Sequence, residues 1–219
     1  MKVSRNVVTE LAETVVRIGR HEWPLRLTPA AEAFLEAAAE ALGIGPDADV
    51  RQVLEKLGPL ARMIGATVSN TSNPTLLNAG YKVNVVPGAA AASVDGRFLP
   101  GCEEEFLAEL DSLLGPGVQR EYINTDSAVE TTFDGDLCAA MTAALLAEDP
   151  EARTVPYCMS GGTDAKSFSR LGIRCFGFAP LRLPADTDFF GMFHGVDERV
   201  PVDALRFGVR VLDGFLDRC

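Results

Sequence analysis

The chain has 219 residues, of which 47% are apolar and 23% are charged. This composition is typical of a globular protein with a buried core and excludes a disordered one. The 20 basic and 31 acidic residues give a formal net charge of −11. A chain this acidic lacks the positive surface that binds nucleic acid or anionic lipid, so we expect neither as a partner. The N-terminal residues lack the apolar stretch of a signal peptide, which predicts a cytoplasmic location.

Apolar periodicity and capping residues predict three helices in the first 57 residues, over 6–19, 29–42 and 49–57. Thr28 is the expected N-cap of the second helix, with Pro29 at its first position. Beyond residue 65 the pattern changes to short strands separated by turn residues, over 66–69, 75–79, 82–86 and 90–99. A helix opening at Glu103 and a returning strand over 118–124 follow. This order resembles a ferredoxin-like antiparallel sheet with helices, without its first strand.

From about residue 134 the elements alternate. We expect helices over 136–147, 164–170 and 202–217, and strands over 153–157 and 173–178. Alternation of this kind favours an α/β arrangement with a parallel sheet. The predicted fold class is therefore α+β followed by α/β, with a first domain over residues 1–130 and a second over residues 131–219.

Cysteine and histidine usage limits the metal chemistry of the chain. The five cysteines are odd in number and show no C-x-x-C spacing, which predicts free thiols. Only two histidines are present, His21 and His194. A catalytic zinc site usually takes three protein ligands. Metal chemistry here must therefore depend on carboxylates or on residues outside this chain.

The first candidate site is the glycine-rich stretch of residues 159–165, between a predicted strand and a predicted helix. Backbone N–H groups of Gly161, Gly162 and Thr163 could bind an oxyanion or a carboxylate at this position. An ordinary turn in which Thr163 or Asp164 caps the helix explains the same residues. The stretch lacks the ending of a phosphate-binding loop. It also lacks the G-x-S-x-G pattern of a nucleophile elbow, because residue 158, two before Ser160, is a cysteine.

Two further candidates lie on either side of that stretch. His194 precedes Gly195 and is followed by two acidic residues, so it could ligate a metal or transfer a proton, although a histidine in a loop is often simply exposed. Asn84 lies in the run Asn-Val-Val-Pro-Gly, and Arg97 ends the run Val-Asp-Gly-Arg. An arginine presented by a sheet can bind a carboxylate through two parallel hydrogen bonds. A solvated strand arginine beside a turn asparagine is the plainer interpretation.

Taken in this order, the motifs resemble one family, the co-catalytic zinc amidohydrolases and metallopeptidases. That family includes aminoacylase, succinyl-diaminopimelate desuccinylase, acetylornithine deacetylase, carboxypeptidase G and dipeptidases. The resemblance extends from the helix at Asn6 to the C-terminus. It implies a lid or dimerisation domain over residues 1–130 and the end of a catalytic domain over 131–219. It also implies hydrolysis of the amide bond of an N-acyl amino acid or dipeptide that has a free carboxylate.

The resemblance assigns a role to each matching residue. His194 would bind one of two zinc ions, and Asn84 and Arg97 would bind the substrate carboxylate or the tetrahedral intermediate, in one subunit or across a homodimer. The loop of Gly161, Gly162 and Thr163 would contact the same carboxylate. The family's other metal ligands and its general-base glutamate have no counterpart here. We therefore expect the C-terminal part of such an enzyme, without a catalytic residue or a complete zinc site of its own.

Two alternatives differ from this interpretation in function. One is a non-catalytic dimerisation or ligand-binding module that derives from the same family and has lost the metal site. The other is a serine hydrolase that uses Ser160, His194 and Asp197. The second alternative is disfavoured because Ser160 does not lie on the strained turn that exposes such a nucleophile.

Overall fold

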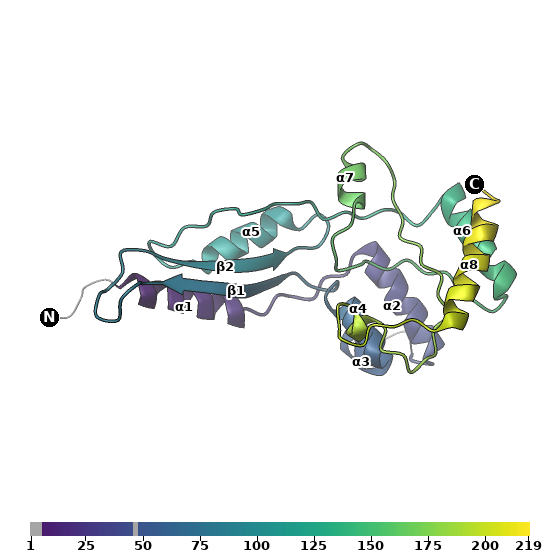
Figure 1. The fold of residues 1–219 in the computed structure, drawn as a ribbon, viewed down its shortest axis with the longest axis horizontal. Coiled ribbons are helices and arrows are strands. Elements are labelled where there is room, and N and C mark those ends of the chain that lie inside the picture. The colour runs from purple at the N-terminus through teal and green to yellow at the C-terminus, as the bar shows by residue number, and fades with distance from the viewer. Residues whose placement is uncertain (1–5, 46–47) are drawn as a thin grey trace. The chain divides into compact units, whose positions relative to one another are not determined.

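A computed structural model describes residues 6–45 and 48–219 of the chain. The chain divides into two compact units, each built from two stretches of sequence (Figure 1). The first unit comprises the described residues up to Arg26 and Val68–Ala128, and the second comprises Leu27–Thr67 and Val129–Cys219. The expected domain boundary at residue 130 lies next to the end of the first unit. Residues 27–67, which we expected in the first domain, pack with the C-terminal stretch.

The first unit contains a two-stranded antiparallel sheet and two helices. Its elements are α1 (Val7–Arg20), β1 (Thr71–Ala79), β2 (Ala90–Arg97) and α5 (Glu103–Ser112). The strands pair with Thr71 opposite Arg97 and Ala79 opposite Ala90, so the connecting loop of residues 80–89 lies at one end of the hairpin. Ile18 of α1 and Phe106 of α5 share one buried cluster, which places both helices over the same core.

An aromatic stack fixes α5 to the sheet. Phe106 is 2% exposed and stacks on Trp23, with 4.7 Å between the ring centroids. The Trp23 indole N–H donates a hydrogen bond to the Ser72 hydroxyl at 3.0 Å, which ties the stack to β1. Gly96 of β2 has no room for a side chain, because a Cβ there would lie 2.8 Å from Cζ of Phe106. A glycine in this strand therefore permits the close approach of the ring.

The second unit is mainly helical. Its elements are α2 (Pro29–Ala41), α3 (Val50–Leu57), η1 (Gly58–Leu60), α4 (Ala61–Gly65), α6 (Asp136–Glu148), α7 (Ala165–Ser169), η2 (Phe190–Met192) and α8 (Val202–Leu216). As predicted, Thr28 caps α2, its hydroxyl accepting a hydrogen bond from the Ala31 N–H at 3.3 Å. Helices α6 and α8 lie side by side (Figure 1) and pack through a buried cluster of Ala144, Phe207 and Val211. Among the described residues, no helix is both long and apolar enough to span a membrane.

The mixed class of helices and antiparallel sheet is confirmed, but several predicted strands are wrong. No strand forms over residues 66–69, 82–86, 118–124, 153–157 or 173–178. The sheet found in the described part of the chain has two strands, and the predicted parallel sheet is not among its elements. β-branched residues favour extended backbone, yet a strand also requires a neighbour that exchanges hydrogen bonds with it. Residues 66–69 form only an isolated bridge, between Ser69 and Leu25, and the other four segments have no strand partner among the described residues.

Candidate functional site

Asn84 lies in the loop that joins β1 to β2. The loop contains a tight turn in which the Val85 N–H donates to the Lys82 carbonyl at 3.2 Å. Gly80 enters the loop with a φ of +73°, a left-handed conformation that glycine adopts readily. The Asn84 side chain is exposed. Its amide is therefore presented to solvent at the tip of the hairpin.

Arg97 lies at the other end of the hairpin, as the last residue of β2. Its Nε donates to Oδ2 of Asp95 at 2.9 Å, and both side chains are about half exposed, at 54% and 46%. Residues two apart on a strand share one face, so Asp95 and Arg97 point to the same side of the sheet while Gly96 faces Phe106. The pair is a solvated ion pair that holds the guanidinium over the strand end.

The hairpin separates Asn84 from Arg97 within one chain. Ala90, where the loop ends, and Arg97 are seven residues apart on β2. At about 3.3 Å per residue, this length corresponds to roughly 23 Å. Figure 1 shows the loop at one end of the two strands and the end of β2 at the other. The structure therefore does not bring the two predicted carboxylate-binding residues together in one protomer.

The glycine-rich loop forms the turn that leads into α7. Gly161, Gly162 and Thr163 are all exposed. The Thr163 hydroxyl accepts a hydrogen bond from the Ala165 N–H at 3.3 Å, while Asp164 makes no capping hydrogen bond through its side chain. Thr163 thus caps the turn before α7, which is the plainer of the two interpretations of this stretch given above.

His194 lies in an unusual backbone conformation. Its φ is +58°, the left-handed region that few residues other than glycine occupy. The next residue closes the turn: the Gly195 N–H donates to the Met192 carbonyl at 2.9 Å, and a Cβ on Gly195 would lie 2.9 Å from that same oxygen. Gly195 is therefore required by the turn that orients His194. The imidazole is exposed.

The donor set around His194 does not fit a metal ion by itself. Nowhere in residues 6–45 and 48–219 do three or more histidine, cysteine, aspartate or glutamate side chains gather in positions that could bind a metal. His194 is followed by Asp197 and Glu198, and both are exposed. Among the described residues, His194 thus offers one imidazole without a gathered set of further donors, and we derive no catalytic step from a metal.

Two of the cysteines are held in an unreactive form. All five are free thiols. Burial raises the pKa of the Cys158 thiol, and the nearby negative charge of Glu130 raises it further. Burial likewise raises the pKa of Cys138. Both groups are therefore kept in the protonated form, which is the unreactive one.

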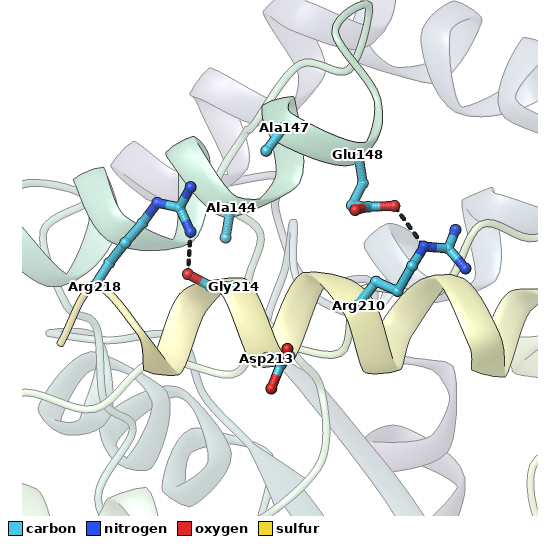
Figure 2. A pocket seen from close by; sticks show the side chains of 7 residues that line it. All are labelled: Ala144, Ala147, Glu148, Arg210, Asp213, Gly214 and Arg218. Atoms are coloured by element: carbon cyan, nitrogen blue, oxygen red, sulfur yellow. Dashed lines mark hydrogen bonds and ion pairs between the residues drawn. The ribbon is translucent and has the colours of Figure 1, made fainter.

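One surface groove is lined by none of the predicted site residues. Figure 2 shows its lining residues on α6 and α8 and on the residues that follow α8. Its volume is about 350 Å³. Its lining comprises Ala144, Ala147, Glu148, Arg210, Asp213, Gly214 and Arg218. The Arg210 Nε donates to Oε2 of Glu148 at 2.6 Å. Two arginines and two acidic residues leave the groove without net charge, so it does not select an anion. The sequence did not predict this groove, because it forms only where α6 packs against α8.

Comparison with known proteins accounts for the order of these motifs. The family model described as Peptidase family M20/M25/M40 matches residues 19–218. The chain is 27% identical over 158 residues to the human N-fatty-acyl-amino acid synthase/hydrolase PM20D1, a match covering 68% of this chain and 31% of that protein. It is 28% identical over 159 residues to mouse Aminoacylase-1, covering 66% of this chain and 35% of that protein. The chain thus spans about a third of the length of these curated relatives.

A solved structure supports the fold. The M20 family metallo-carboxypeptidase Sso-CP2 from Sulfolobus solfataricus superposes with a TM-score of 0.56 and 18% sequence identity. The match covers 99% of this chain and 56% of that one. At this identity the likeness establishes a shared fold. Together with the family match, which includes every predicted site residue, it shows that this chain belongs to peptidase family M20/M25/M40, a family of metallopeptidases and related hydrolases.

Proposed function

We propose that this chain is part of a zinc-dependent hydrolase that cleaves the amide bond of an N-acyl amino acid or a dipeptide with a free carboxylate. The observation that carries the proposal is the family match over residues 19–218, which contains Asn84, Arg97, the 161–163 loop and His194. The names of two relatives, an N-fatty-acyl-amino acid synthase/hydrolase and an aminoacylase, both refer to acylated amino acids. This supports an acylated amino acid as the substrate class.

In this proposal the chain contributes binding of the substrate carboxylate. Arg97 offers a planar guanidinium that can form two parallel hydrogen bonds with a carboxylate. Asn84 offers an amide, and Gly161, Gly162 and Thr163 offer backbone N–H groups. The separation of Asn84 and Arg97 along the hairpin supports a homodimer in which one of them reaches the site of the other subunit. The first unit, with its sheet, would then form the lid, and the second unit, which also takes in residues 27–67, would form the end of the catalytic domain.

The metal site would be completed by residues other than those described here. His194 is the proposed ligand, and one imidazole does not retain a catalytic zinc ion. We therefore propose that this chain alone neither binds two zinc ions nor hydrolyses amides. The same observation favours a second candidate, a non-catalytic dimerisation or ligand-binding module of the family. Both candidates predict carboxylate binding by this chain.

Ligand titration followed by NMR tests the carboxylate site. The probes are an N-acetyl amino acid and its C-terminal amide, which differ only in the carboxylate. We expect the acid to shift resonances near Arg97 and the amide to leave them unchanged. Arg97→Lys should weaken binding of the acid, because lysine cannot reproduce the two parallel hydrogen bonds.

Arg120→Lys is the matched control for that substitution. Arg120 also lies in the first unit and also pairs with a carboxylate, that of Asp111, with Nε and Oδ1 2.7 Å apart. It has no proposed role in substrate binding, so this variant should bind the acid like the wild type. Equal binding of acid and amide by the wild type would contradict the proposed site.

A further inference from the structure

The segment that leads into His194 is tied to a helix that is distant in sequence. Arg62 lies on α4, and its Nη1 is 3.0 Å from Oδ2 of Asp188, which comes shortly before η2. Helix η2 packs against both α4 and η1, and it is the short yellow-green helix beside the α4 label in Figure 1. The two partners of the ion pair belong to the two stretches of the second unit. The pair therefore joins residues 27–67 to the segment before His194.

Asp188 connects Arg62 to the backbone of η2. Its Oδ1 accepts a hydrogen bond from the Gly191 N–H at 3.0 Å, while its Oδ2 pairs with the guanidinium. The Asp188 carbonyl accepts a further hydrogen bond from the Met192 N–H at 3.2 Å, and the Met192 carbonyl accepts the Gly195 N–H at 2.9 Å. A continuous series of contacts thus connects the guanidinium to the turn of the proposed metal ligand.

Gly191 permits the close approach of the ion pair to this backbone. A Cβ on Gly191 would overlap the Asp188 carboxylate and would lie 2.5 Å from Nη1 of Arg62. No side chain therefore separates the two charged groups from the backbone of η2. Glycine is the residue that allows such an approach. The ion pair thus lies directly against the segment that it connects.

The backbone of His194 requires support from its surroundings. A residue other than glycine with a φ of +58° has a sparsely populated conformation, which persists only where the neighbouring structure determines it. The Gly195 N–H closes the turn from its C-terminal side. Asp188 acts from the N-terminal side, where it orders the backbone of η2. The two ends of the turn are therefore fixed separately, and the N-terminal end depends on Arg62.

We propose that Arg62 is a positioning residue for His194 and acts through Asp188. The guanidinium orients the carboxylate, and the carboxylate orients the η2 backbone from which the His194 turn continues. The ion pair is exposed, at 66% and 39% for its two side chains, so it adds little to the stability of the unit and its effect is local. Its relevance to catalysis rests on the proposed function, in which His194 is a metal ligand.

NMR of the isotopically labelled chain without metal tests the positioning. A positive φ brings the amide proton of a residue closer to its own Hα than a negative φ does, so the intraresidue NOE of His194 reports its backbone conformation. In Arg62→Gln we expect this NOE to weaken. Exchange of the Gly195 amide with water should become about two- to fivefold faster, the range that loss of an exposed ion pair supports. The buried Val211 amide of α8 should keep its wild-type exchange, because the unit as a whole is not destabilised.

Arg153→Gln is the matched control. Arg153 also joins the two stretches of the second unit through an exposed ion pair, with its Nη2 2.9 Å from Oε2 of Glu40, so this variant makes the same change in net charge. It should leave the His194 NOE and the Gly195 exchange at their wild-type values. Arg62→Lys keeps a cation beside the carboxylate and should recover most of the wild-type behaviour.

Asp188→Asn tests whether Arg62 acts through the carboxylate. The asparagine oxygen can still accept the Gly191 N–H, but the ion pair is lost. The double variant Arg62→Gln, Asp188→Asn should therefore exchange at Gly195 no faster than the more affected single variant. Additive effects, or a wild-type NOE and exchange rate in Arg62→Gln, would overturn the proposal. Because these measurements contain no metal, failure of His194 to respond to added zinc would contradict the proposed function alone.

Discussion

The two units position their candidate site residues in different ways. In the first unit, Arg97 ends a strand whose register is fixed by β1 and whose inner face is held by Phe106. In the second unit, Thr163 and His194 lie in turns, and the His194 turn depends on Gly195. The packing of the core fixes the position of a residue at a strand end, whereas a few local hydrogen bonds fix the position of a residue in a turn. Core substitutions should therefore act on the first set of residues, and turn substitutions on the second.

The largest effect is expected from Phe106→Ala. The substitution removes the ring that stacks on Trp23 and covers Gly96. Emptying such a site costs about 3–5 kcal/mol of unfolding free energy, measured by urea denaturation. Phe168→Ala in the second unit is the control, since that ring is 48% exposed and should cost far less. If the two variants lost equal amounts of unfolding free energy, the stability of the first unit would not depend on this aromatic stack.

Gly96→Ala should give an intermediate effect. The new methyl group would lie 2.8 Å from the Phe106 ring, and the stacked ring cannot move without losing Trp23. Overpacking of this kind costs about 1–3 kcal/mol, measured by thermal denaturation. Gly88→Ala is the matched control, because a methyl group there would meet no atom within 4 Å and the backbone at Gly88 is not left-handed. A fully stable Gly96→Ala would show that the ring does not lie against β2.

Gly195→Ala should change the second unit locally and leave its core intact. The methyl group would approach the Met192 carbonyl oxygen to 2.9 Å and open the turn around His194. Because turns open without global unfolding, we expect a loss under about 1 kcal/mol together with faster amide exchange near residue 195. Hydrogen exchange followed by NMR separates the two quantities. Protection unchanged at the turn would contradict the requirement for glycine.

The smallest effect is expected from Asp111→Asn, and it depends on pH. Hydrogen bonds from Arg120, with Nε and Oδ1 2.7 Å apart, lower the pKa of Asp111 below its usual range. A lowered folded pKa stabilises the protein above the unfolded value of about 3.9, and this stabilisation is lost as the pH falls through the folded value. Because the pair is solvent-exposed, we expect a difference of only a few tenths of a kcal/mol at pH 7.

Urea denaturation of the wild type and Asp111→Asn at pH 7 and at successively lower pH measures that difference. The two stabilities should converge below about pH 4. Glu40→Gln is the companion variant in the second unit, where Arg153 lowers the pKa of Glu40 through one hydrogen bond of 2.9 Å. A difference that grows as the pH falls would have the wrong sign for a carboxylate stabilised by an arginine.

The sequence predicts the helices well because their signals are local. Thr28 and Pro29 mark the start of α2, and the predicted final helix over 202–217 corresponds to α8. The strands over 153–157 and 173–178 were predicted wrongly because pairing depends on a neighbour that local composition does not specify. The division into units was also beyond local signals, since residues 27–67 join the second unit through contacts distant in sequence.

The order of the motifs along the sequence identified the candidate site residues. It could not predict the distances between them. The run containing Asn84 and the run ending at Arg97 are close in sequence, yet β2 places them at opposite ends of a hairpin. The left-handed backbone of His194 likewise has no signature in the residues around it other than Gly195. Spacing along a chain identifies a family, whereas the distance between side chains depends on how the strands pair.

Zinc titration by calorimetry, run beside a hydrolysis assay on an N-acyl amino acid, tests the central claim most directly. We predict that this chain, with His194 as its single matching ligand and no cluster of three donors among its described residues, takes up no stoichiometric pair of zinc ions and shows no turnover. Tight binding of two zinc ions per chain, or hydrolysis that a chelator abolishes, would contradict this claim.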